Sequence, residues 1–158
     1  MRRYTDLPLP AEPYQPGRGA HPRSLPAGAH LPVLAAEPID PDDWRRCVRW
    51  LYAVDLFNAG CWWEVHEVLE GAWLASGRTT PGAVFVQGLI QIAAALLKRS
   101  QDGTRDARSL RRRGAAKLRS VADPCMGLHV SSFLASIDAY FAGEAPRPPV
   151  IELRDIPG

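Results

Sequence analysis

Apolar residues recur at helical spacing along five stretches of the chain, separated by turn-forming residues. The first stretch places apolar side chains three and four positions apart, at Trp44, Cys47, Val48, Leu51 and Tyr52. Before it, Asp40-Pro41-Asp42-Asp43 offers an N-cap acceptor, a proline suited to a first helical turn, and acids at the positive end of the helix dipole. We therefore predict a first helix that begins at this cap and ends at Gly60.

The same periodicity predicts four further helices, over about 62–74, 83–98, 104–121 and 124–141. The third follows the start signal Thr79-Thr80-Pro81 and is apolar on nearly every side, which places it at the centre of the bundle. No pair of strands is indicated. The fold class is therefore all-α, a multihelical bundle of about five helices with short connections.

Proline divides the chain into unequal parts, because nine of the 15 prolines lie in the first 41 residues. Repeated X-Pro pairs favour extended or turn backbone and disfavour a long helix. We predict a proline-rich N-terminal arm over 1–41, a helical domain over 42–145 and an extended C-terminal tail over 146–158. Scattered tyrosines and leucines in the arm favour its packing on or near the bundle over disorder.

Composition is that of an ordinary soluble domain, with 158 residues, 46% hydrophobic and 23% charged. The three cysteines are widely spaced without a C-x-x-C, which excludes a disulfide framework and indicates small, reduced core residues. The longest apolar stretch, Ala83–Leu97, is shorter than the roughly 18 residues of a spanning helix. No signal peptide is indicated, so we expect a soluble, cytoplasmic protein that does not enter a membrane.

The candidate chemistry lies on the second helix, where His66 and Glu70 are neighbours at positions i and i+4. At about 100° per residue, they share one face with Trp63 and Trp73. Glu64 and Glu67 fall on the far side, and we expect both to be solvated. His66 and Glu70 are thus the candidate catalytic pair, with the two tryptophans as walls of a pocket.

The third helix offers hydrogen-bonding partners for that pair. Gln87 and Gln91 are the polar side chains within its apolar run, again at positions i and i+4. Because each amide both donates and accepts, it can bridge an imidazole and a carboxylate. We predict a network of His66, Glu70, Gln87 and Gln91 between the second and third helices, which a glutamine pointing into bulk solvent would contradict.

Three functions compete for this network. The first is a core of hydrogen bonds in a binding or scaffold protein. The second is a divalent-metal site with His66 and Glu70 as ligands, in which His21, His30 or His129 would complete the ligand set. Against a metal site, the spacing H-E-x-x-E matches neither the H-E-x-x-H zinc motif nor the E-x-x-H motif of di-iron bundles. The third is acid–base catalysis, possible in a hydrolase, in which Glu70 orients His66 toward water or a substrate proton.

Two stretches of the chain resemble the small helical bacterial and archaeal family known as domain of unknown function 309. The second-helix region carries Phe57-Asn58-Ala59-Gly60-x-x-Trp63-Glu64-x-His66-Glu67-x-Leu69-Glu70-x-x-Trp73, followed by Gln87-Gly88-Leu89-Ile90-Gln91-x-Ala93. The arm carries Pro16-Gly17-Arg18-x-x-His21-Pro22 and Gly28-x-His30, which resemble an N-terminal element of part of that family. The resemblance implies an all-helical fold without an established reaction, and an arm that brings Arg18, His21 and His30 toward the His66 pocket.

Charge is strongly polarised along the chain. Residues 98–119 carry net +7, so the remainder totals −5 within an overall charge of +2. A stripe of arginines at 105, 108, 112 and 119 is compatible with nucleic acid or another anion. However, the pI is only about 8.6 and no aromatic residues interleave, which makes nucleic acid the less favoured partner. Because residues 50–77 carry net −4, a basic-on-acidic contact in a homo-oligomer is favoured.

Overall fold

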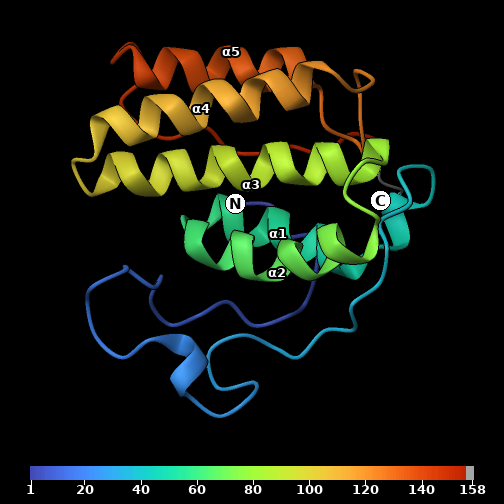
Figure 1. Ribbon diagram of the computed structural model, residues 1–158, viewed down its shortest axis with the longest axis vertical. Helices are drawn as coiled ribbons and strands as arrows, with labels where there is room; N and C mark the ends of the chain where they lie inside the picture. The colour runs from blue at the N-terminus through green and yellow to red at the C-terminus, as the bar shows by residue number, and fades with distance from the viewer. Residues whose placement is uncertain (156–158) are drawn as a thin grey trace.

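The computed structural model describes residues 1–155, and within that range the chain forms five α-helices and no strand (Figure 1). They are α1 (Val48–Asn58), α2 (Trp62–Ala75), α3 (Pro81–Ser100), α4 (Thr104–Arg119) and α5 (Val130–Phe141), with 3₁₀ turns at η1 (Pro22–Ser24) and η2 (Trp44–Arg46). α4 and α5 lie on one side of α3, and α1 and α2 lie on the other, with the arm beyond them (Figure 1). The prediction of an all-α, five-helix bundle is confirmed.

α3 occupies the centre, as its apolar circumference predicts. It begins as expected at Thr80, whose side chain accepts the N–H of Ala83 at 3.2 Å, and it packs against α2 and α4. The approach to α4 depends on two glycines. A Cβ on Gly114 would lie 2.8 Å from the carbonyl oxygen of Gly88, and a Cβ on Gly88 would lie 2.9 Å from Cγ of Leu118.

The first α-helix starts later than predicted. The carboxylate of Asp40 accepts the N–H of Asp42 at 2.9 Å, which closes a local turn, and a separate 3₁₀ turn, η2, precedes α1. Trp44 in η2 is 4% exposed, and its ring lies where a Cβ on Gly127 would be. Trp44 therefore fits the apolar spacing because the 3₁₀ turn is buried in the core, and not because the turn and α1 form one continuous helix.

The fifth helix also starts later than predicted. Residues 125–128 form a turn closed by a bridge between Cys125 and Leu128. Asp123 reaches over this turn and accepts the N–H groups of Val130 and Ser131 at 2.8 and 2.9 Å. The aspartate thus satisfies donors at the start of α5 from seven residues upstream, rather than beginning the helix itself.

The proline-rich arm is folded onto α1 and α2. Asp55 of α1 is fully buried and accepts the backbone N–H groups of Tyr4 and Thr5 at 2.8 and 2.9 Å. The Tyr52 hydroxyl donates to the Pro8 carbonyl at 2.7 Å. The predicted packing of the arm on the bundle is confirmed.

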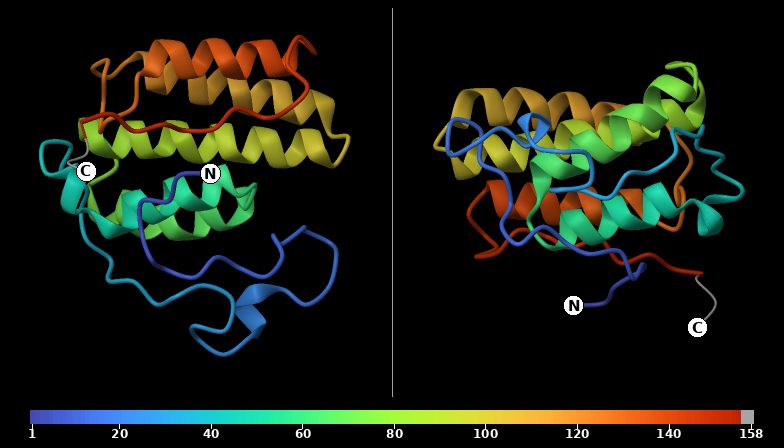
Figure 2. Two further views of the ribbon diagram at one scale, coloured as in Figure 1. Left: turned by 180° about the vertical axis from the view of Figure 1, so that it is seen from behind. Right: turned by 90° about the horizontal axis from the view of Figure 1, so that it is seen from below.

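The C-terminal segment runs extended across the bundle, beside the start of the arm (Figure 2). Its Ile151 and Leu153 are 1% and 3% exposed. The side-chain amide of Asn58 donates to the Ile151 carbonyl at 2.8 Å and accepts the Ile151 N–H at 2.6 Å. The Tyr4 hydroxyl accepts the N–H of Leu153 at 2.9 Å, so the two ends of the chain stabilise one another.

The cysteines are free, as predicted; Cys61 and Cys125 are buried and Cys47 is half-buried. Burial raises the pKa of Cys61 to about 12 and that of Cys125 to about 11. At 20 residues, α3 is longer than the apolar stretch counted from the sequence, and its length and composition would allow it to cross a membrane. Because 61% of its apolar window is buried inside the bundle, it has the pattern of a core helix of a soluble protein.

Candidate functional site

The polar face of α2 lies against the arm, and its centre is the buried carboxylate of Glu64. One carboxylate oxygen, Oε1, accepts the backbone N–H of Tyr14 at 2.7 Å and lies 2.7 Å from Nε2 of His30. The side chain is 0% exposed, so the expectation that Glu64 is solvated is wrong. A helical wheel places Glu64 outside the apolar arc of α2, but the arm covers that side of the helix.

Trp63 organises the aromatic side chains of the arm. Tyr14, His21 and His30 approach its ring edge-on, with centroid distances of 4.8, 5.4 and 6.2 Å. His21 is also fixed through Nδ1, which accepts the N–H of Arg23 at 3.1 Å and caps η1. Both arm histidines that carry the resemblance therefore meet α2, although neither contacts His66 through a hydrogen bond in the described part of the chain.

The predicted pair of His66 and Glu70 is more open than expected. His66 Nε2 lies 3.6 Å from Glu70 Oε2, beyond ordinary hydrogen-bond distance, and the side chains are 42% and 38% exposed. Arg23 of the arm instead contacts the acids, at 2.6 Å to Glu67 and 3.7 Å to Glu70. Hydrogen bonding and attraction by Glu67 raise the pKa of Arg23. Glu67, expected to be solvated, is thus paired with the arm.

One group on α2 has the spacing that a metal ion requires. His66, Glu67 and Glu70 each offer a ligand atom within 4.8 Å of the others. One imidazole and two carboxylates form a donor set that suits zinc or manganese. The arm histidine predicted as a further ligand, His21, is not in this group; Glu67 takes its place beside His66 and Glu70.

The predicted network across α2 and α3 does not form. Gln91 Oε1 accepts from Nζ of Lys117 on α4 at 3.0 Å, and no hydrogen bond within residues 1–155 joins Gln87 or Gln91 to His66 or Glu70. The close packing of α3 on α4 decides this, because Cβ of Gln91 lies 3.1 Å from a Cβ built on Gly114. Gln91 consequently belongs to the α4 side of α3.

The remaining predicted pocket residues lie apart from Glu64. The guanidinium of Arg78 covers the Trp73 ring at 5.3 Å, while the Trp73 indole N–H is buried without a partner. Arg18 is exposed, in a turn where its N–H donates to the Gln15 carbonyl at 2.9 Å. Neither residue joins the cluster around Trp63 that brings the arm and α2 together.

His30 also lines a hollow of about 510 Å³ between two passes of the arm. Its other walls are Pro8, Leu9, Pro10, Ala11, Glu12, Gly28, Ala29 and Pro32. Behind His30, the second oxygen of Glu64, Oε2, is buried without a hydrogen-bond partner. The geometry is that of a carboxylate that orients an imidazole at the edge of a small pocket, which we call the arm pocket.

Sequence reasoning missed the pairing of Glu64 with His30 and the role of Arg23. The spacing within α2 carries no information on which face the arm covers. The available signal was the joint resemblance of Gly28-x-His30 and the α2 motif to one family.

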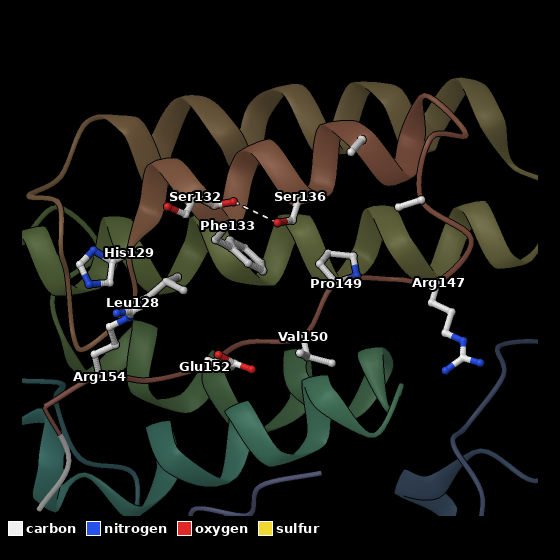
Figure 3. Close-up of a pocket in the computed structure, with 12 residues that line it drawn as sticks. Leu128, His129, Ser132, Phe133, Ser136, Arg147, Pro149, Val150, Glu152 and Arg154 are labelled. Atoms are coloured by element: carbon white, nitrogen blue, oxygen red, sulfur yellow. Dashed lines mark hydrogen bonds between the residues drawn. The ribbon is translucent and has the colours of Figure 1, made fainter.

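A larger hollow of about 600 Å³ lies between α5 and the C-terminal segment (Figure 3). Ser132 lies in α5 and His129 directly precedes that helix, while Val150 and Glu152 come from the segment opposite (Figure 3). The dashed contact is the Ser136 hydroxyl donating to the Ser132 carbonyl at 3.1 Å. Among the described residues, no hydrogen bond connects the histidine, serine hydroxyl and glutamate, so the groups do not form a nucleophilic triad.

Residues 50–110 match the model of a family described as Domain of unknown function (DUF309). The match extends from α1 into α4 and includes all the polar residues of α2 discussed above. No curated protein matches the chain.

Proposed function

We propose that this chain, in which residues 50–110 match the DUF309 model, is a binding protein whose ligand site is the arm pocket. The observation that carries the proposal is the pair of the buried Glu64 and the half-buried His30. A fully buried carboxylate is costly unless donors surround it, and here one oxygen receives two contacts while the other receives none. His30 lies at the wall of the hollow, where its ring can contact a bound molecule as well as Glu64.

The chemistry of the pocket favours a ligand that donates hydrogen bonds. With Nε2 of His30 directed at Glu64, Nδ1 is the ring nitrogen left for a ligand, and it accepts a hydrogen bond when it carries no proton. Glu12 adds a carboxylate to the lining, and prolines supply apolar walls. We propose a small ligand with a cationic, N–H-bearing head, such as an amidinium or ammonium group beside an apolar body.

Titration of the full chain with benzamidine, with benzoate as the anion of similar shape, tests this by calorimetry. We expect benzamidine to bind and benzoate not to. Glu12→Gln, at an exposed residue, should weaken benzamidine about tenfold, the effect of roughly 1.4 kcal/mol from one charged hydrogen bond. His129→Gln, in the larger hollow, is the matched control for His30→Gln. Absence of benzamidine binding would overturn the proposal, as would Glu12→Gln and His30→Gln variants that both bind benzamidine as tightly as the wild type.

A divalent cation at His66, Glu67 and Glu70 is the second candidate, favoured by their mutual spacing within 4.8 Å. Arg23 occupies two of these carboxylates, so a cation has to displace its guanidinium. We expect Arg23→Gln to bind Mn²⁺ more tightly than the wild type, and Glu70→Gln to lose that binding in the same titration. If the Arg23 variant binds neither Mn²⁺ nor Zn²⁺, the candidate fails.

Acid–base catalysis by His66 and Glu70 stays a prediction. At their separation of 3.6 Å, a water molecule or substrate group would have to contact both side chains. We also propose a cytoplasmic location, which the three free cysteines support because thiols persist in a reducing compartment.

A further inference from the structure

Three arginines converge on a groove between α4 and α5, far along the chain from the arm pocket. The groove has a volume of about 470 Å³, and its lining residues come from the end of α3, the first half of α4 and the end of α5. These three segments lie at the same end of the bundle (Figure 1). Its lining is Arg99, Thr104, Ala107, Arg108, Arg111, Asp138, Phe141 and Ala142. We call it the arginine groove.

Two of the arginines are held in place by contacts with α5. The guanidinium of Arg99 lies over the rings of Tyr140 and Phe141, at 4.6 and 5.1 Å, and donates to the Phe141 carbonyl at 3.3 Å. Arg111 pairs with Asp138 at 2.5 Å and lies 5.3 Å from the Phe141 ring centre. Stacking and ion pairing therefore position both cations before any ligand arrives.

The positive charge in the groove is only partly compensated. Three guanidinium groups face one carboxylate, that of Asp138. Arg108 is exposed and forms no ion pair within the described residues, and the buried Nε of Arg111 has no hydrogen-bond partner. At the start of α4, the N-cap Gly103 has no side chain to satisfy the free N–H groups, although Asp106 places one carboxylate in the same turn.

We infer that the arginine groove binds a small phosphate-bearing molecule. Guanidinium groups bind phosphate oxygens in paired hydrogen bonds, and the volume falls in the range of small-molecule sites. Phe141 and the two alanines offer an apolar wall for the remainder of such a molecule. A duplex would instead meet the outer face of α4, where Arg105 and Arg112 lie outside the groove.

Calorimetric titration of the full chain with pyrophosphate at low ionic strength tests this inference. We expect binding that Arg108→Gln weakens at least tenfold. Arg113→Gln is the matched control, because it removes the same charge from the same helix at an exposed position outside the groove. We expect it to change the affinity less than threefold. No pyrophosphate binding, or equal losses in the two variants, would overturn the inference.

A second variant separates the groove from general attraction to a basic protein. Asp138→Asn keeps an oxygen that can accept from Arg111 and hold it in place, but removes the negative charge that opposes phosphate, so pyrophosphate should bind more tightly than to the wild type. An unchanged or lower affinity in a folded Asp138 variant would contradict the groove. Duplex DNA that binds more strongly than pyrophosphate, and that Arg112→Gln weakens as much as Arg108→Gln, would replace the groove with a nucleic-acid surface on α4.

Discussion

Two buried carboxylates, Asp55 and Glu64, show how single residues fix the arm on the bundle. Both are 0% exposed, and both accept backbone N–H groups that the arm cannot satisfy within itself. An extended, proline-rich segment has few internal hydrogen bonds, so side-chain acceptors on the helices take the place of a neighbouring strand. The arm is thereby ordered without secondary structure over most of its length.

A third carboxylate, Asp123, gives a prediction for the dependence of stability on pH. Hydrogen bonds from the side chain and backbone of Ser131 hold the pKa of Asp123 below its ordinary value of 3.8. A lowered pKa in the folded state means that the stabilisation is present above pH 3.8 and is lost as the pH falls through the folded-state value.

Asp123→Asn should therefore lower the free energy of unfolding at neutral pH. As the pH falls from about 5 to 2, the free energy of unfolding of this variant should decrease less than that of the wild type. Urea unfolding at a series of pH values measures both effects. Asp102→Asn, at an exposed residue, is the control for overall charge. An unchanged acid limb in the Asp123 variant would contradict the role of this carboxylate.

At the scale of elements, the contact between α3 and α4 depends on the absence of side chains at Gly88 and Gly114. The carbonyl of each glycine lies close to the position that a Cβ on the other would occupy, at 2.8 and 3.1 Å. Glycine within a helix costs about 1 kcal/mol relative to alanine. The close approach of the backbones offsets that cost through the packing of α3 against α4.

Gly114→Ala should lower the free energy of unfolding by about 1–3 kcal/mol, because the added methyl group meets backbone that cannot move aside. Gly71→Ala in α2 is the matched control. A Cβ at Gly71 would have its nearest neighbour, a nitrogen of the Arg49 guanidinium, at 3.6 Å, which is an ordinary contact. Because alanine favours a helix over glycine, the free energy of unfolding of this variant should rise by up to about 1 kcal/mol. Chemical denaturation of both variants measures the difference, and equal gains would refute the steric argument.

At the scale of the whole molecule, the start of the arm and the C-terminal segment both pack on α1 and contact each other. The start of the arm contacts α1 through Asp55 and the C-terminal segment through Tyr4, while Asn58 pairs with that segment. The arm also supplies His30 and Arg23 to the face of α2. Removing the arm would therefore expose two buried carboxylates and dismantle the arm pocket together.

Asp55→Asn should release the first residues of the arm and destabilise the protein by about 2 kcal/mol, since hydrogen bonds to charged groups are worth about 1.5–3 kcal/mol. Limited proteolysis should cut within the arm faster than in the wild type, and urea unfolding gives the energy. Asp6→Asn, an exposed neighbour in the arm, should leave both unchanged. Wild-type resistance in the Asp55 variant would show that this carboxylate does not hold the arm.

Charge polarity also belongs to this scale, and the predicted contact between copies remains a prediction. The basic segment 98–119 supplies the three arginines of the arginine groove. The acids of residues 50–77, in contrast, already have partners within the chain. Asp55 and Glu64 are buried within one chain, which leaves Glu67 and Glu70 as the more accessible acids of α2. A homo-oligomer built on opposite charge would therefore rely on fewer acids than the sequence alone indicates.

The sequence by itself determined the helical class, the central position of α3 and most helix ends. These features follow from local physics: apolar spacing along the helix, capping by Thr80, and the turn at Gly60 with its φ of +76°. The starts of α1 and α5 were wrong because Trp44 and Asp123 act through contacts outside their own turns.

Only the tertiary structure decided which polar groups meet. His66 and Glu70 were found from their spacing, but Glu64 owes its burial to a segment about 50 residues away in sequence, through Tyr14. Likewise, Gln91 contacts α4 because two glycines let that helix approach. A helical wheel specifies directions around one axis, whereas the partner in each direction depends on how the whole chain packs.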